Sequence, residues 1–147
     1  MELRGNNDEL LSIERSWLRG GTGIRKIWEK LATGLAHEDL LLNITIRVYG
    51  YSAADQGWVT NDDWRTFMSD LHELERQRQG TATLAGVSHP DFSLVFKSTD
   101  KAGHMAVTGF LGDFSPADDF PLKLEFGFSF DPGTLQSIVS ALDELGR

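Results

Sequence analysis

The stretch from Leu122 to Leu145 constrains the fold more than any other part of the chain, because its apolar residues change period in the middle. Up to Phe130 every second residue is large and apolar, which is typical of a strand with one buried face. At Asp131-Pro132 the carboxylate can cap a first helical turn, and proline at the first helical position loses no hydrogen bond. Apolar residues then recur at helical spacing, and Gly146 can supply a left-handed residue that ends the helix. The sequence therefore predicts a strand that leads directly into a helix over about residues 132–145.

A similar start signal precedes a second helix. Thr60 and Asp63 have the spacing of a capping box, and the apolar residues that follow predict an amphipathic helix over about residues 61–79 that ends at Gly80. A shorter apolar stripe indicates a further short helix near residues 23–33. Two of the three predicted helices thus lie in the C-terminal two thirds of the chain.

Strand-period segments fill most of the remaining chain. Two short strands are expected before residue 16, a long strand over Leu40–Tyr51, and four more segments between residues 81 and 130. Residues 52–59 have the polar, glycine-containing composition of a loop. We therefore expect a single α+β domain over residues 1–147. It would have a mainly antiparallel sheet of about six to seven strands, with the two long amphipathic helices on one face.

Charge and composition limit the partners of the chain. The 147 residues carry a net charge of −8, and the surplus of acid lies after residue 50. Such a field disfavours nucleic acid and anionic membranes and favours a basic protein or a cation. The chain has no cysteine, no basic leader followed by an apolar core, and no apolar run long enough to span a membrane. We expect a cytoplasmic protein that binds neither nucleic acid nor membrane.

No motif of catalysis or cofactor binding is present. The four histidines lack zinc-site spacing, and phosphate-loop and nucleophile-elbow patterns do not occur, so we expect no catalytic residue, metal or cofactor. Asp100 and His104 could form an orienting acid and a base, but the favoured interpretation is a loop acid that accepts backbone amides and a surface histidine. The pairs Asp62-Asp63 and Asp118-Asp119 could perform acid–base chemistry in a cleft, although the first pair also suits a helix N-terminus.

Trp58 differs from the aromatic residues that occur at helix or strand spacing. It lies in the predicted loop, with Asp55 before it and Asp62-Asp63 after it. An exposed tryptophan among acids would suit an anchor for a protein partner. The alternative is a ring that folds down onto the sheet.

Three short segments carry a likeness to a known family. They are the helix start Asn61-Asp62-Asp63-Trp64-Arg65-Thr66-Phe67, the hairpin Asp100-Lys101-Ala102-Gly103-His104 and the strand end Phe126-Gly127-Phe128-Ser129-Phe130-Asp131-Pro132. Over roughly residues 40–145 the chain resembles WapI-like bacterial immunity proteins and neighbouring uncharacterised families. The resemblance implies a small α+β protein, encoded beside a secreted toxin, that binds and neutralises the toxin without catalysing a reaction.

The leading hypothesis is therefore a non-enzymatic immunity-type protein that binds a protein partner, such as a basic toxin domain. The residues expected to bind this partner are Asp55, Trp58, Asp113, Asp118 and Asp119. The alternative is a homo-oligomeric structural or small-ligand-binding module. This alternative is considered because the strands carry more large apolar residues than two helices can cover.

Overall fold

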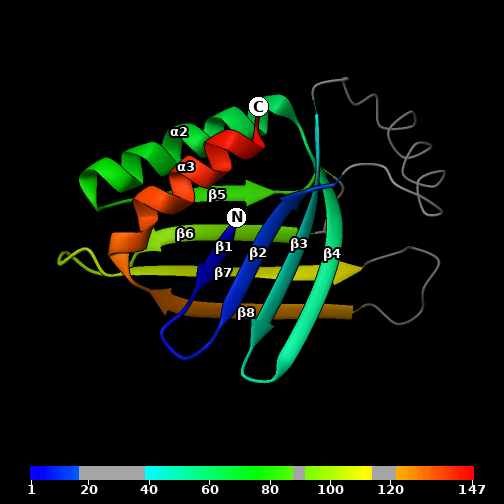
Figure 1. Cartoon of the computed structure of the whole chain (residues 1–147), viewed down its shortest axis with the longest axis horizontal. Coiled ribbons are helices and arrows are strands. Elements are labelled where there is room, and N and C mark those ends of the chain that lie inside the picture. The colour runs from blue at the N-terminus through cyan, green and yellow to red at the C-terminus, as the bar shows by residue number, and fades with distance from the viewer. Residues whose placement is uncertain (17–38, 88–91, 114–121) are drawn as a thin grey trace.

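The structure is a computed structural model that describes residues 1–16, 39–87, 92–113 and 122–147 (Figure 1). The short helix expected near residues 23–33 lies outside these ranges. The described elements are β1 (Glu2–Arg4), β2 (Leu10–Arg15), β3 (Leu40–Val48), β4 (Tyr51–Val59), α2 (Asn61–Gln77), β5 (Thr81–Ala85), β6 (Phe92–Ser98), β7 (Met105–Asp113), β8 (Leu122–Phe130), η1 (Pro132–Thr134) and α3 (Leu135–Leu145).

The eight described strands form two antiparallel sheets of four strands each. The first sheet has the order β1-β2-β3-β4 and the second the order β5-β6-β7-β8, so each strand pairs with its neighbour in sequence. The α+β class and the antiparallel pairing are as predicted. The prediction of one sheet with six to seven strands was wrong, because the strands divide into two sheets. Alternation along a strand identifies its apolar face but not the element that covers this face.

The strand count differs because residues 52–59, expected to be a loop, belong to β4. Alanine, aspartate and glycine are depleted in strands, so the composition of this segment concealed it. Its pairing with β3 is set by the two-residue turn Tyr49–Gly50, in which both residues have positive φ (50° and 84°). Positive φ at both central positions matches the right-handed twist of a hairpin. The strand expected to reach Tyr51 consequently ends at Val48.

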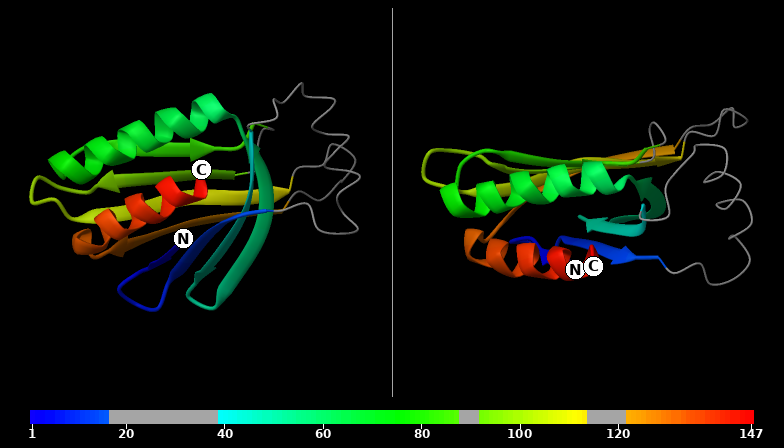
Figure 2. Two further views of the ribbon diagram at one scale, coloured as in Figure 1. Left: turned by 45° about the horizontal axis from the view of Figure 1, so that its top comes forward. Right: turned by 90° about the horizontal axis from the view of Figure 1, so that it is seen from above.

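Both helices lie on the same side of the second sheet as the first sheet does (Figures 1 and 2). α2 packs against β5 and β6, and α3 packs against α2. The first sheet crosses in front of β7 and β8, with β4 in contact with β7. The prediction that the two helices cover one face is confirmed, and the first sheet covers the remainder of that face.

One continuous hydrophobic core joins the two sheets and the helices. A row of aromatic rings crosses it, with centroid distances of 5.8 Å from Trp64 to Phe67, 5.9 Å from Phe67 to Phe96 and 6.4 Å from Phe96 to Phe130. Aromatic pairs at this separation add to the burial of their large apolar areas. Burial falls along β8 towards its start, where Leu122 is 74% exposed.

The helix starts follow the predicted chemistry. The Thr60 hydroxyl accepts a hydrogen bond from the amide of Asp63 (3.0 Å) and donates one to the Asp63 carboxylate (2.7 Å). Asp131 accepts a hydrogen bond from the amide of Gly133 (2.8 Å). This second cap is followed by the 3-10 turn η1, so α3 begins at Leu135.

The helix ends differ from the prediction. α2 ends at Gln77, and the left-handed residue that caps it is Arg78, with a φ of 57°, rather than Gly80. The amide of Arg78 donates to the carbonyl oxygen of Leu74 (2.9 Å), so the left-handed residue satisfies a helix-end acceptor in spite of its side chain. Gly146 has a φ of −78°, so the left-handed role predicted for it was wrong.

Candidate functional site

The predicted partner-binding residues that the structure describes lie in β4 and at the end of β7. Asp55 and Trp58 lie in β4, and Asp113 is the last residue of β7, opposite Leu122 of β8. The C-terminal ends of β4 and β7 lie on the same side of the molecule (Figure 1). Asp118 and Asp119 lie outside the described residues.

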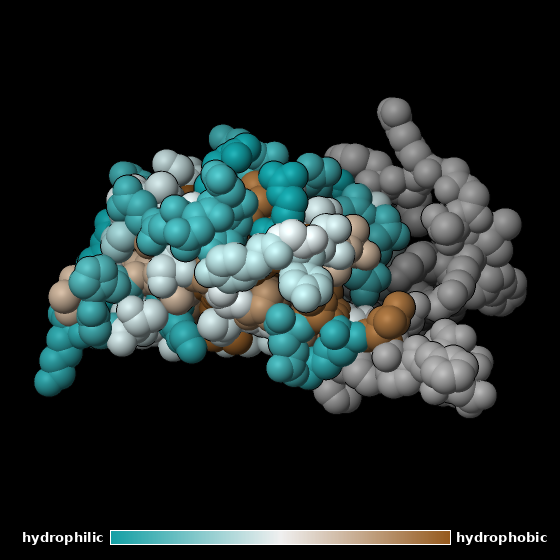
Figure 3. All heavy atoms as spheres, turned by 90° about the horizontal axis from the view of Figure 1, so that it is seen from below, coloured by the Kyte–Doolittle hydropathy of each residue, from teal (hydrophilic) through white to brown (hydrophobic). Residues whose placement is uncertain are grey.

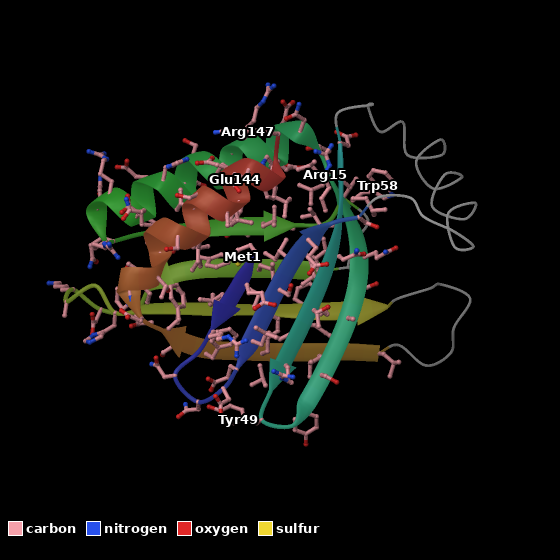
Figure 4. The ribbon with its side chains drawn as sticks, viewed as in Figure 1. Met1, Arg15, Tyr49, Trp58, Glu144 and Arg147 are labelled. Atoms are coloured by element: carbon pink, nitrogen blue, oxygen red, sulfur yellow. The ribbon has the colours of Figure 1, made fainter. Side chains whose placement is uncertain are left out.

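Trp58 is a buried strand residue. Its side chain is 6% exposed, and it pairs with Leu41 of β3, which is also buried. Its carbonyl oxygen accepts a hydrogen bond from the amide of Val87 (2.8 Å), which connects β4 to the segment after β5 (Figure 4). The geometry fits the alternative in which the ring packs down, and it does not fit an exposed aromatic anchor.

Asp55 lies on the core-facing side of β4. It pairs with Ile44, whose side chain is fully buried, and its own side chain is half-buried. A carboxylate oxygen accepts a hydrogen bond from the amide of Gln56 (2.7 Å). Among the described strands β4 lies at the edge of the first sheet, where an inward-pointing charge opposes pairing with another sheet. This structural role explains the aspartate, and its binding role stays a prediction.

Asp100 and His104 do meet, in the exposed hairpin between β6 and β7. His104 Nδ1 lies 2.6 Å from Asp100 Oδ2, and Asp100 Oδ1 accepts the amides of Ala102 (2.9 Å) and His104 (3.2 Å). The hydrogen bond from the His104 side chain, helped by these amides, lowers the pKa of Asp100 below its ordinary value. This is the arrangement of a loop acid that orders a turn. Within the described ranges, no three His, Asp or Glu side chains are grouped as metal ligands.

A cavity of about 460 Å³ opens beside the start of α2. Arginines from three parts of the chain line it, namely Arg15, Arg65 and Arg147, together with Leu40, Asn61, Trp64 and Gly146 (Figure 4). Guanidinium groups bind carboxylates or phosphates well. Acids are close as well, because the Asp39 carboxylate accepts the amide of Asn61 (3.0 Å). Sequence reasoning missed this cavity because its arginines are distant in sequence and share no motif.

The described residues thus define a small antiparallel α+β scaffold with exposed polar turns. Comparison with known proteins gives the family. The model of the immunity protein WapI-like family matches residues 25–146, and the chain belongs to that family. No curated protein and no solved structure matches the chain significantly. The expected resemblance is confirmed, and immunity proteins of this kind are generally non-enzymatic. In the described parts, neither helix has the length and apolar content to span a membrane.

Proposed function

We propose that this chain is a cytoplasmic, non-enzymatic immunity protein that neutralises a bacterial toxin by direct protein–protein contact. The observation that carries the proposal is the family match over residues 25–146. The ordering role of Asp100 in its hairpin supports the non-enzymatic part, because it accounts for the Asp100–His104 pair without catalysis.

Charge complementarity is the proposed basis of toxin recognition. With a net charge of −8, the chain would steer a basic toxin domain towards itself before contact. We propose that Asp55, Asp113, Asp118 and Asp119 contribute to this field. Trp58 would act from the interior, by holding the end of β4 in place. Because salt screens exposed charges beyond about 8 Å at physiological ionic strength, association should slow as salt is added.

The arrangement of the core supports this proposal over an oligomeric module. The large apolar strand residues that motivated an oligomer pack within one chain, because the two sheets and the helices share one core. The second sheet therefore does not need another copy of the chain to cover its apolar face.

Co-expression tests the proposal. The toxin encoded by the adjacent gene is induced in a susceptible host, with and without this chain, and growth is recorded. Relief of growth arrest, together with co-purification of the two proteins, is the expected result. A catalytically inactivated toxin serves as the expression control. Continued growth arrest in cells that contain comparable amounts of folded immunity protein would refute the proposal.

A further inference from the structure

Two turns lie side by side at one end of the first sheet (Figures 1 and 4). One is the β1–β2 turn over residues 5–9, and the other is the Tyr49–Gly50 turn between β3 and β4. Strand pairing brings them together, because Leu10 pairs with both Arg4 and Arg47. The pair of turns is here called the tyrosine end. It lies at the bottom of the view in Figure 1, away from the helices at the top.

The tyrosine end exposes two large aromatic side chains. Tyr49 is 72% exposed and Tyr51 is 70% exposed, on either side of Gly50. The neighbouring turn adds the exposed residues Asn6, Asn7 and Asp8. Seen from the side of the turns, this face is mostly hydrophilic or intermediate in hydropathy, and strongly apolar atoms occupy only small areas (Figure 3).

Tyr49 has a backbone conformation that is unfavourable for its side chain. Its φ of 50° lies in the left-handed region, which bulky residues rarely adopt. At this turn position asparagine, aspartate or glycine is the usual residue. An unfavourable conformation retained at an exposed position is a reason to look for a function of this side chain.

Glu9 orders the β1–β2 turn, which lies beside the Tyr49–Gly50 turn. It is 2% exposed, and its carboxylate accepts the amide (2.7 Å) and the side-chain amide (3.3 Å) of Asn7. Burial alone would raise the pKa of Glu9, but hydrogen bonds, foremost those from Asn7, outweigh burial and hold this pKa below its ordinary value. The tyrosines therefore lie beside a turn that hydrogen bonds to a buried carboxylate hold in shape.

This composition suits recognition of a protein surface. Tyrosine supplies a large amphipathic area with few rotatable bonds, and asparagine supplies adaptable hydrogen bonds. Tyrosine is also enriched among residues that dominate binding energy. Single exposed aromatic residues are ordinary on protein surfaces, but two on either side of one glycine, one of them at positive φ, are not explained by the core.

We propose that the tyrosine end is the contact surface for the toxin, with Tyr51 as its main anchor. The inference rests on the proposed function and gives it a location. The partner surface would be hydrogen-bonding and would have a shallow recess that accepts a tyrosine ring. Because Arg4 and Arg47 lie next to the turns, acidic steering arises elsewhere on the chain and the tyrosine end provides the short-range contact.

Nitration can test this contact at two residues only. Tyr49 and Tyr51 are the two tyrosines of the sequence, and the chain has no cysteine to compete for tetranitromethane. The free chain and its complex with the inactivated toxin from the adjacent gene are treated in parallel, and nitrated peptides are quantified by mass spectrometry. Both tyrosines should react in the free chain and be protected in the complex.

Substitutions provide the second readout. Tyr51→Ala should raise the Kd for the inactivated toxin about tenfold or more, as expected of a hot spot. Gln136→Ala, which truncates an exposed residue of α3, is the matched control and should stay within about twofold. Circular dichroism and thermal melting confirm that each variant is folded.

The outcomes separate the two proposals. If the wild-type chain binds the toxin while both tyrosines stay reactive and Tyr51→Ala binds within about twofold, the inference is overturned and the proposed function stands. If the wild-type chain binds no toxin and gives no protection from it, the proposed function fails and the inference fails with it.

Discussion

Glu9→Gln should destabilise the folded chain at neutral pH, although the two side chains have nearly the same shape. The Glu9 carboxylate is buried and accepts two hydrogen bonds from Asn7. Glutamine keeps one acceptor oxygen but turns an NH2 group towards these donors. Losing one charge-assisted hydrogen bond costs about 1.5–3 kcal/mol, and the easier burial of a neutral amide offsets part of it. We expect a net loss of about 2 kcal/mol in the free energy of unfolding.

The effect should depend on pH in a defined direction. The folded pKa of Glu9 lies below its ordinary value of 4.5, so the unfolded chain binds this proton more readily. The stabilisation by Glu9 is therefore complete above the unfolded pKa and is lost as the pH falls through the folded pKa. The difference between wild type and Glu9→Gln should be largest at neutral pH and should shrink in acid.

Urea unfolding followed by tryptophan fluorescence, repeated from pH 7 down to pH 3, measures this difference. Asp8→Asn is the matched control, because Asp8 is exposed and its left-handed φ of 64° suits asparagine equally. The control should change stability by less than about 0.5 kcal/mol. A Glu9→Gln effect as small as that at pH 7, or one that does not change with pH, would refute the assignment of Glu9 as a charged brace.

Three further substitutions test the core, the second sheet and a cap by the same unfolding assay at pH 7. Phe67→Ala removes a fully buried ring that contacts Trp64 and Phe96. It should lower the free energy of unfolding by about 3–5 kcal/mol, and a loss below about 1 kcal/mol would contradict this packing. Gly109→Ala would place a Cβ 2.1 Å from the carbonyl oxygen of Ser93, so strand β7 would have to shift. The free energy of unfolding should fall by about 2 kcal/mol or more, and an unchanged value would refute the close approach. Thr60→Ala removes the α2 cap and should cost about 1 kcal/mol, with Thr60→Ser expected to retain most of it.

Local structure was predictable where one short segment contains the whole signal. The period change between Leu122 and Leu145 fixed a strand and a helix, and the Thr60–Asp63 spacing fixed the start of α2. β4 was missed because its stability comes from pairing with β3 across the Tyr49–Gly50 turn rather than from its own composition. Helix ends were less predictable, since Arg78 adopts a conformation that Gly80 was better suited to adopt.

The surface was less predictable than the fold, because exposure depends on what packs over a residue. Sequence alone assigned Trp58 to a loop, but pairing with β3 places it in a buried part of β4. Tyr49 and Tyr51 looked like the end of a long strand, but Tyr49 belongs to an exposed turn and Tyr51 begins the next strand. Positions that depend on contacts distant in sequence, such as the arginine-lined cavity, leave no local pattern to read.

The order of the strands also has a consequence during translation. The first sheet is complete in sequence at Val59, whereas the second sheet is complete only at Phe130. At a synthesis rate of about 5–20 residues per second, roughly 4 to 14 seconds separate the two events. During that interval the apolar face of the first sheet, with Ile44 and Ile46, has no second sheet to cover it. Nascent chains should therefore depend on chaperones most strongly in this window, and slowing translation after residue 59 should increase aggregation.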